Sequence, residues 1–258
     1  MEISGEFWPV LLSTFGLFLL VGFLAQLIDG AVGMAYGVVS SSVLLAFGVP
    51  PAQVSATAHA AECFTTGASG ASHLIHRNVD WKLFWRLAPA GVVGGVIGAY
   101  LLTGFDPTFI KAVVVAYLGV LGVFMLGRAI AGPKEEPPHL KHVIPLGIAG
   151  GFLDASGGGG WGPIVTSSLI GQGTTPRYAI GSVNLAEFFV TAAISGTFFL
   201  TIGLELWPII SGLILGGVIA APFAAYATKH LPDKALMIIV GGVVILLSLR
   251  TLLSALHA

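Results

Sequence analysis

The chain has 258 residues, of which 55% are hydrophobic and only 9% are charged, and its mean hydropathy is +0.94. Soluble domains carry about 25% charged residues, so this chain has too little polar surface to face water and is predicted to lie in a membrane. The net charge of −1 excludes a basic surface for nucleic acid. The single cysteine, Cys63, excludes a disulfide framework and a cysteine-rich metal site.

Seven apolar segments are about 20 residues long, which is enough to cross a bilayer core of about 30 Å. They cover residues 8–28, 52–74, 83–102, 107–131, 178–200, 206–228 and 234–256. Glu2 and Glu6 stand where a cleaved signal peptide carries positive charge, so the first segment is expected to be retained. Three shorter apolar pieces each border a glycine-rich break: 36–47, 143–153 and 163–170. We predict an all-α membrane protein with broken or re-entrant helices at the glycine-rich loops.

A polar, proline-rich stretch at 132–142 (G-P-K-E-E-P-P-H-L-K-H) separates two halves, 1–131 and 143–258. Shifting the sequence by 125 positions aligns 29–66 with 154–191 without a gap and gives 11 identities in 38 positions. Apolar residues coincide by chance, so the pairs that carry most weight are Asp29/Asp154, Pro51/Pro176 and Glu62/Glu187. The sequence therefore predicts two related transmembrane repeats joined by a cytoplasmic linker.

The positive charges set the expected orientation, because cytoplasmic loops are enriched in Lys and Arg. The basic loops contain Arg77, Lys82 and Arg86; Arg128, Lys134 and Lys141; and Lys229 and Lys234. The loops at 104–106 and 201–205 contain neither residue type. Repeat one then starts outside and ends inside, and repeat two does the reverse. We therefore predict two inverted-topology repeats of about five hydrophobic segments each, with both termini outside.

Four carboxylates fall within apolar surroundings: Asp29, Glu62, Asp154 and Glu187. An ionisable group at the bilayer centre costs at least about 2.5–3.5 kcal/mol, so such groups are functional candidates by default. Each glutamate lies 11 residues after a proline that suits the first turn of a helix. That is roughly 16 Å along a helix, near the bilayer midplane. We assign proton coupling or gating to these four residues and to His59, which precedes Glu62 by three positions.

Polar residues at three-and-four spacing surround each glutamate and so share its helix face. They are Ser55, His59, Thr66 and Ser69 in the first repeat, and Asn184, Thr191 and Ser195 in the second. Such a face has to meet another helix or a wet cavity. Hydrogen bonding between helices by Ser and Thr is the ordinary alternative. From these stripes we predict Thr66, Asn184 and Thr191 as substrate-binding residues.

Two glycine-rich breaks read D-G-A-V-G-M-A-Y-G at 29–37 and D-A-S-G-G-G-G-W-G-P at 154–163. Irregular backbone at membrane depth is tolerated only where it is buried in protein or lines a cavity. Interrupted helices at matching places in two inverted halves indicate a transport site, where exposed N–H groups hold an anion. The alternative is that the glycines serve close helix packing. The substrate-binding residues predicted from the breaks are Gly33, Tyr36, Gly37, Gly158, Gly159, Gly160, Trp161 and Gly162.

No Lys or Arg falls in the predicted midplane region, so an anion there would meet carboxylates that repel it unless they are neutralised. We hypothesise that Glu62 and Glu187 are at least transiently neutral and carry protons coupled to transport. His59-x-x-Glu62 has the spacing of a metal-binding pair, but its counterpart is Asn184-x-x-Glu187 and no cysteine cluster accompanies it. We predict neither a metal nor a cofactor.

These residues also carry a resemblance to a known family. The matching stretches are D-G-A-V-G-M-A-Y-G (29–37), H-A-A-E-C-F-T-T-G-A-S-G-A-S-H (59–73), N-V-D-W-K-L-F (78–84), G-G-G-G-W-G-P (157–163) and G-S-V-N-L-A-E-F (181–188). They resemble the TauE/SafE family of sulfite and organosulfonate exporters. The resemblance implies a multi-pass carrier in the bacterial cytoplasmic (inner) membrane that moves anionic sulfur compounds, usually exporting sulfite. Other members take up sulfonates or carry other anions.

The predicted function is therefore a secondary transporter that exports sulfite or a related sulfur-containing anion, such as an organosulfonate, by alternating access. The alternatives are an anion channel, an uptake carrier for another small anion, and an intramembrane enzyme. We expect no enzymatic activity. No G-x-x-x-x-G-K-[ST] motif is present, so an ion gradient or the gradient of the substrate is the expected energy source. The expected partners are a small anion and the lipid bilayer, without nucleic acid.

Overall fold

The computed structural model describes residues 7–131, 142–230 and 233–256, and every regular element in these ranges is a helix. In chain order the helices are α1 (Phe7–Val32), α2 (Tyr36–Ala46), α3 (Pro51–Ile75), α4 (Trp81–Gly104), α5 (Pro107–Ala131), α6 (Val143–Gly157), the π-helix η1 (Trp161–Thr166), α7 (Ser167–Gly171), α8 (Pro176–Thr201), α9 (Trp207–His230) and α10 (Asp233–Leu256). The all-α prediction is confirmed. The linker predicted at 132–142 lies, apart from His142, outside the described residues.

The predicted apolar segments correspond to helices one for one. The seven long segments are α1, α3, α4, α5, α8, α9 and α10, and the three short pieces are α2, α6 and η1 with α7. Pro51 and Pro176 begin α3 and α8, where proline lacks only an N–H that the first turn leaves unpaired. Asp80 begins α4, because its carboxylate accepts hydrogen bonds from the backbone N–H groups of Lys82 and Leu83.

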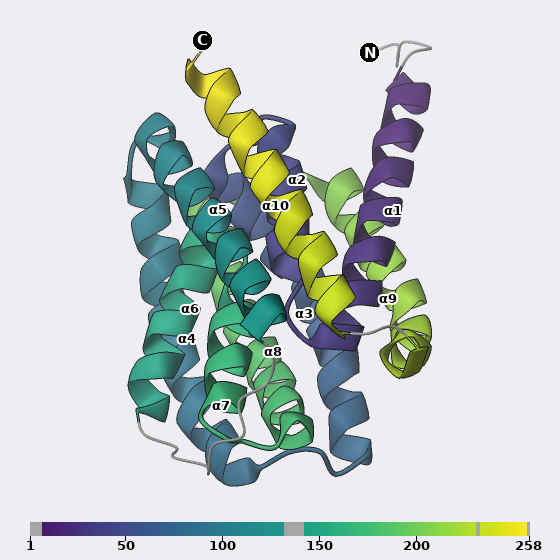
Figure 1. Cartoon of the computed structure of the whole chain (residues 1–258). Coiled ribbons are helices and arrows are strands. Elements are labelled where there is room, and N and C mark those ends of the chain that lie inside the picture. Colours follow the sequence, from purple (N-terminus) through teal and green to yellow (C-terminus); the bar gives the residue numbers. More distant parts are fainter. Residues whose placement is uncertain (1–6, 132–141, 231–232, 257–258) are drawn as a thin grey trace.

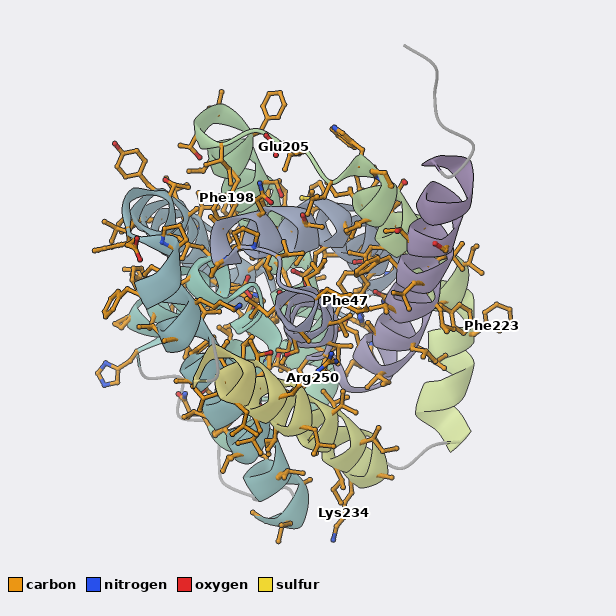
Figure 2. All side chains as sticks on the ribbon, turned by 90° about the horizontal axis from the view of Figure 1, so that it is seen from above. Phe47, Phe198, Glu205, Phe223, Lys234 and Arg250 are labelled. Atoms are coloured by element: carbon orange, nitrogen blue, oxygen red, sulfur yellow. The ribbon has the colours of Figure 1, made fainter. Side chains whose placement is uncertain are left out.

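The surface of the helices is suited to lipid. Within the described residues, α4, α8 and 109–131 of α5 are long and apolar enough to span a membrane, and five shorter apolar helical segments accompany them. Large apolar side chains are exposed along the bundle, such as Leu200 at 83% and Phe223 at 56% of their surface. Phe223 projects away from the helices in the view from above (Figure 2). These features fit an integral membrane protein, since apolar side chains on this scale are unfavourable in water.

Four helix pairs make the most extensive contacts: α1 with α9, α4 with α6, α3 with α8, and α5 with α10 (Figure 1). α4 packs almost as extensively against α8, whereas the related contact of α9 with α3 is smaller. The shift of 125 residues relates α1 to α6, α4 to α9, α3 to α8 and α5 to α10. The shift therefore converts the α1–α9 pair into the α4–α6 pair, and it maps the α3–α8 pair and the α5–α10 pair onto themselves. In Figure 1, α1 begins at the end of the molecule where α10 ends, and α6 begins at the opposite end.

Small residues let the backbones of these pairs approach closely. A Cβ atom added at Gly216 of α9 would lie 2.0 Å from the carbonyl oxygen of Leu19 in α1. A Cβ at Gly151 of α6 would lie 2.2 Å from the carbonyl oxygen of Gly91 in α4. Gly91 and Gly216 are 125 positions apart, but their partners Gly151 and Leu19 are not aligned, so glycine allows close approach in both pairs without repeating the same contact. Helices in membranes associate through such small-residue contacts, because lipid provides no hydrophobic driving force between them.

Both glycine-rich segments interrupt the helices, as predicted. The first interruption separates α1 from α2, and the second separates α6 from η1. Gly33 and Gly158 stand at aligned positions in the two breaks and have φ values of +74° and +68°. This left-handed conformation is favourable for glycine and unfavourable for residues with a Cβ. The same backbone feature therefore ends the helix in both halves.

Candidate functional site

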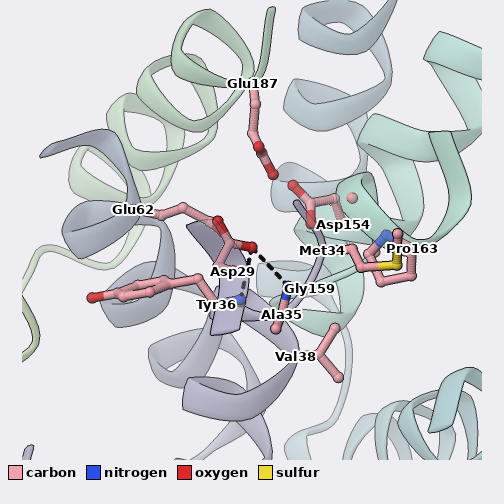
Figure 3. Close-up of a pocket in the computed structure, with 13 residues that line it drawn as sticks. Asp29, Met34, Ala35, Tyr36, Val38, Glu62, Asp154, Gly159, Pro163 and Glu187 are labelled. Carbon is pink, nitrogen blue, oxygen red and sulfur yellow. Dashed lines mark hydrogen bonds between the residues drawn. The ribbon is translucent and has the colours of Figure 1, made fainter. Parts of the chain in front are cut away.

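A small interior cavity lies where the two breaks meet α3 and α8 (Figure 3). It is narrow, with room for only about one water molecule. It is lined by Asp29, Met34, Ala35, Tyr36, Gly37, Val38, Glu62, Asp154, Gly159, Gly160, Gly162, Pro163 and Glu187. The four carboxylates singled out from the sequence therefore face one cavity, although they come from α1, α3, α6 and α8.

The two aspartates hold the helix that follows each break. Asp29 Oδ1 accepts hydrogen bonds from the backbone N–H groups of Ala35 (2.7 Å) and Tyr36 (3.2 Å), drawn as dashed lines in Figure 3. Asp154 Oδ1 accepts from the backbone N–H of Trp161 (3.0 Å). Tyr36 and Trp161 are themselves 125 positions apart, so the contact is repeated atom for atom. A carboxylate satisfies orphan N–H groups and the positive end of the helix dipole.

These bonds bear on the anion site expected at the helix starts. The N–H groups of Tyr36 and Trp161 each donate to a carboxylate of the protein itself. The indole N–H of Trp161 donates to the carbonyl oxygen of Val183 at 3.3 Å. The phenolic O–H of Tyr36 donates to the carbonyl oxygen of Leu213 at 2.9 Å. In this conformation the donors of these two aromatic residues are engaged within the protein.

A buried histidine completes the first half of the site. His59 Nε2 lies 3.1 Å from Asp154 Oδ2, and both side chains are almost fully buried. His59 Nδ1 lies 2.8 Å from the carbonyl oxygen of Ser55, which can only accept a hydrogen bond. Nδ1 therefore carries a proton, and Nε2 is the atom presented to Asp154. Asn184 is the counterpart of His59. Among the described residues, its side chain makes no hydrogen bond to Asp29.

The two glutamates face the cavity from α3 and α8 (Figure 3). Glu62 is 4% exposed, and its Oε2 atom has no hydrogen-bond partner among the described residues. A Cβ atom added at Gly37 would lie 3.3 Å from Glu62 Oε1, so glycine lets this carboxylate approach the first break. Glu187 is 7% exposed, and its carboxylate points toward Asp154 in Figure 3.

Several predicted site residues do not line the cavity: Gly33, His59, Thr66, Gly158, Trp161, Asn184 and Thr191. The hydroxyl of Thr66 donates to the carbonyl oxygen of Glu62 (2.7 Å), and that of Thr191 donates to the carbonyl oxygen of Glu187 (2.9 Å). These are bonds within one helix turn, which Thr commonly forms. Spacing placed both threonines on the correct helix, but it did not reveal that their hydroxyls bond to their own backbone.

Other residues at the cavity were not predicted. Met34, Ala35, Val38 and Pro163 line it, and all are in or beside the quoted breaks. Tyr117 of α5 donates its phenolic O–H to the carbonyl oxygen of Gly159 at 3.1 Å. The breaks were a signal for the first four residues. Nothing in the sequence around Tyr117 indicates its contact, because the contact depends on how α5 packs against the second break.

The ends of the α3–α8 pair are held unequally. At one end, Arg177 Nε donates to Asn78 Oδ1 (2.6 Å), Arg177 Nη2 contacts the carbonyl oxygen of Arg77 (3.4 Å), and the Asp80 N–H donates to Ser182 Oγ (2.8 Å). At the other end, Gln53 Nε2 donates to Glu205 Oε2 at 3.2 Å. The glutamates Glu62 and Glu187 lie between these two ends. The end of the α3–α8 pair that lies next to Arg77 and Arg177 is therefore held by more hydrogen bonds than the end at Gln53.

Comparison with known proteins identifies the family. The family model described as sulfite exporter TauE/SafE matches residues 18–251. The chain belongs to the TauE/SafE sulfite exporter family. It is 40% identical over 246 residues to the probable membrane transporter protein YtnM of Bacillus subtilis (strain 168), covering 92% of this chain and 82% of that relative. No solved structure matches the chain significantly.

Membership of the TauE/SafE family makes the chain a membrane transporter. This agrees with its apolar helices and with the prediction that it is not an enzyme. It also gives the buried carboxylates a context, because ionisable groups inside a transporter bundle mark substrate or ion pathways. The TauE/SafE match spans both breaks and both glutamate-bearing helices, so the whole cavity lies inside the region that defines the family.

Proposed function

We propose that the protein is a secondary carrier that exports sulfite or a related small sulfur-containing anion, such as an organosulfonate, by alternating access. The observation that carries the proposal is the interior cavity. It is lined by both helix breaks and by one glutamate from each of two facing helices. Cavities between broken helices at the centre of the bundle are the usual substrate sites of secondary transporters. The description of the family supports sulfite as the first substrate to test.

We further propose that the two transmembrane repeats, 1–131 and 143–258, are inverted in the bacterial inner membrane, with both termini outside and the linker in the cytoplasm. The exchange of the α1–α9 and α4–α6 pairs under the 125-residue shift supports this arrangement. The opposite starting ends of α1 and α6 in Figure 1 support it as well. A rocking motion of one repeat against the other would then open the cavity to each side in turn.

Alternating access requires a closure on each side of the cavity. We propose that the contacts of Arg177 with Asn78 and Arg77 form the cytoplasmic closure, and that the Gln53–Glu205 bond belongs to the outer closure. The basic side chains near the first set support the cytoplasmic assignment. Because the cytoplasmic set has more hydrogen bonds, the outer closure is expected to open more easily from this conformation.

The charges of the cavity bear on coupling. None of the residues that line it is Lys or Arg, whereas four of them are Asp or Glu. An anion next to these groups needs compensating positive charge, since unpaired charge in a low-dielectric interior is costly. We propose that part of this charge is a proton on Glu187, whose carboxylate faces the cavity from the second repeat. Transport would then respond to the proton gradient.

The proposal is tested by flux into proteoliposomes that contain the purified protein. Sulfite, methanesulfonate and chloride are each offered at two opposite pH gradients, and counterflow is measured from preloaded vesicles. A carrier gives saturable sulfite or sulfonate flux, counterflow, and a dependence on the direction of the pH gradient that Glu187→Gln removes. Flux without saturation or counterflow indicates a channel, and chemical turnover without a gradient indicates an enzyme. Either result would overturn the proposal, as would equal flux of all three anions.

A further inference from the structure

We propose that His59, Glu62 and Asp154 form a binding site for a divalent transition-metal cation, with Zn²⁺ as the best fit. All three side chains are buried, and one ligand atom from each lies within 4.8 Å of the other two. His59 and Glu62 come from adjacent turns of α3, and Asp154 comes from α6 of the other repeat. The proposal concerns binding to the protein itself and does not require that sulfite is the substrate.

The histidine is held in the orientation that a metal ligand needs. Its Nδ1–H donates to the carbonyl oxygen of Ser55 at 2.8 Å, which leaves the Nε2 atom directed toward Asp154. The Ser55 hydroxyl in turn donates to the carbonyl oxygen of Ala155 at 2.6 Å, which ties this turn of α3 to α6. Histidines that bind metals almost always donate their other ring N–H to a carbonyl or a carboxylate. In His59, the hydrogen bond from Nδ1–H to the Ser55 carbonyl oxygen fixes the tautomer and the ring orientation.

The aspartate is divided between two roles. Asp154 Oδ1 accepts the backbone N–H of Trp161 at 3.0 Å, while Oδ2 lies 3.1 Å from His59 Nε2. Two ligands in neighbouring positions on one ion, with bonds of about 2.0–2.2 Å, lie about 3 Å apart. The Nε2–Oδ2 distance therefore suits a shared cation. The hydrogen bond to Trp161 holds the carboxylate in place for this purpose.

The glutamate supplies the observation that points to a ligand. Glu62 lines the cavity and is only 4% exposed. Its Oε2 atom has no hydrogen-bond partner among the described residues. A buried carboxylate oxygen without a partner is costly. Glu62 Oε1 lies beside Gly37, so the two oxygens are not equivalent. A cation at Oε2 would satisfy the atom that the protein leaves unpaired.

The ligand types indicate the class of cation. One imidazole with two carboxylates suits Zn²⁺ and, more weakly, Mn²⁺, whereas Na⁺ and Mg²⁺ favour oxygen ligands alone. Three protein ligands leave one position for water or for an oxygen of a bound molecule, and the cavity holds about one water-sized particle. Under the proposed function, this ion would supply the positive partner that an anion needs among the carboxylates.

The sequence argued against a metal because Asn184 replaces His59 in the second repeat and no cysteine cluster is present. That comparison looked for a complete ligand set within each repeat. The structure instead completes the set of the first repeat with the aspartate of the second repeat, 95 positions from His59. A single site shared by both repeats needs only one histidine.

The test is metal binding by the purified full-length protein without a polyhistidine tag. The protein in detergent is treated with a chelator, desalted and titrated with ZnCl₂, with MnCl₂, MgCl₂ and NaCl in parallel, and bound metal is measured after a second desalting. The expected result is about one Zn²⁺ per chain, with weaker binding of Mn²⁺ and none of Mg²⁺ or Na⁺. Absence of Zn²⁺ binding at 100-fold excess over protein would overturn the proposal.

Variants show whether this site is the one occupied. Glu62→Gln, Asp154→Asn and His59→Gln should each weaken Zn²⁺ binding at least tenfold. His76→Ala is the control, because it removes a histidine that directly follows α3 and lies outside the cavity lining and the group of three. This control should keep the wild-type affinity. Binding that survives all three test variants, or that falls equally in His76→Ala, would overturn the proposal.

A spectroscopic measurement guards against variants that merely misfold. Mn²⁺ bound to the wild-type protein should give an electron spin echo modulation from an imidazole nitrogen. This signal should be lost in His59→Gln protein that still elutes as a single species and retains its helical circular dichroism. A bound Mn²⁺ without nitrogen coupling in the wild-type protein would place the ion elsewhere and contradict the proposal.

Discussion

The two halves of the cavity have the same backbone plan but different chemistry. In each half an aspartate caps the helix after the break, an aromatic residue provides the capped N–H, and a glutamate faces the cavity. One of the aligned positions at which the halves differ holds His59, whose Nε2 lies 3.1 Å from Asp154 Oδ2, and Asn184, which makes no hydrogen bond to either aspartate among the described residues. The difference shows that two halves can share a backbone plan while only one of them places a histidine against the aspartate of the other.

The largest expected effect comes from removing the aspartate of the histidine-bearing half. Asp154→Ala removes the cap of the Trp161 N–H and leaves His59 without its buried partner, which should cost about 3–5 kcal/mol. Asp29→Ala removes a cap alone and should cost about 0.5–2 kcal/mol. Thermal unfolding in detergent should therefore give a clearly lower midpoint for Asp154→Ala. Asp154→Asn, which keeps an accepting oxygen, is the control, and equal midpoints for the two alanine variants would contradict the asymmetry.

Exchanging the two differing residues tests whether the halves are equivalent. His59→Asn removes the buried imidazole whose Nε2 lies 3.1 Å from Asp154 Oδ2 and which is a ligand of the proposed cation site. Anion flux in proteoliposomes should therefore fall about tenfold or more. The double variant with Asn184→His should not recover, because the side chain of Asn184 makes no hydrogen bond to Asp29 among the described residues, so this position is not placed as His59 is against Asp154. Recovery of flux in the double variant would mean that the two halves are interchangeable.

The aligned glycines Gly37 and Gly162 should differ in their tolerance of a side chain. A Cβ at Gly162 would lie 2.6 Å from Met34 Cα and 2.8 Å from the Gly33 carbonyl oxygen. At Gly37 the nearest atoms, Gly158 O and Gly159 Cα, are 3.0 Å away. Overpacking of this kind costs about 1–3 kcal/mol. Gly162→Ala should therefore lower the thermal midpoint more than Gly37→Ala, and the reverse order would show that the two breaks pack differently from this description.

The smallest effect is expected at the paired threonines. Thr66→Val and Thr191→Val keep the side-chain shape and remove hydroxyls that donate to carbonyl oxygens of their own helices. Thr191 Oγ1 in addition accepts a weak contact from Cys63 Sγ at 3.6 Å. Flux should change less than twofold in both variants, with stability within about 0.5 kcal/mol of wild type. A selective loss of substrate affinity in either variant would return that hydroxyl to the substrate-binding set that the sequence predicted.

Much of the site could be predicted because the chemistry is visible in the chain. Carboxylates are rare in apolar segments, so Asp29, Glu62, Asp154 and Glu187 stood out, and all four line the cavity. The glycine-rich segments also predicted the helix interruptions at Gly33 and Gly158. These features are local, and local residue types and spacing are enough to identify them.

Which atoms are free to bind could not be predicted in the same way. The sequence offered the break N–H groups and Trp161 to an anion. In the structure the backbone N–H groups of Tyr36 and Trp161 donate to Asp29 and Asp154, and the Trp161 indole donates to Val183. It also offered Thr66 and Thr191, whose hydroxyls turn back to their own helices. Hydrogen-bond partners depend on distances of a few tenths of an ångström, which residue spacing does not contain.

The sequence by itself determined that the protein is helical, lies in a membrane, and carries matched breaks and buried carboxylates, because composition, segment length and internal similarity are properties of the chain alone. Only the tertiary structure decided that His59 meets Asp154, 95 positions away, while Asn184 has no equivalent hydrogen bond to Asp29 in the part of the chain that the structure describes. The physical reason is that this pairing is set by the packing of α3 against α6 and of each break against its aspartate. Those contacts join residues that no local pattern relates.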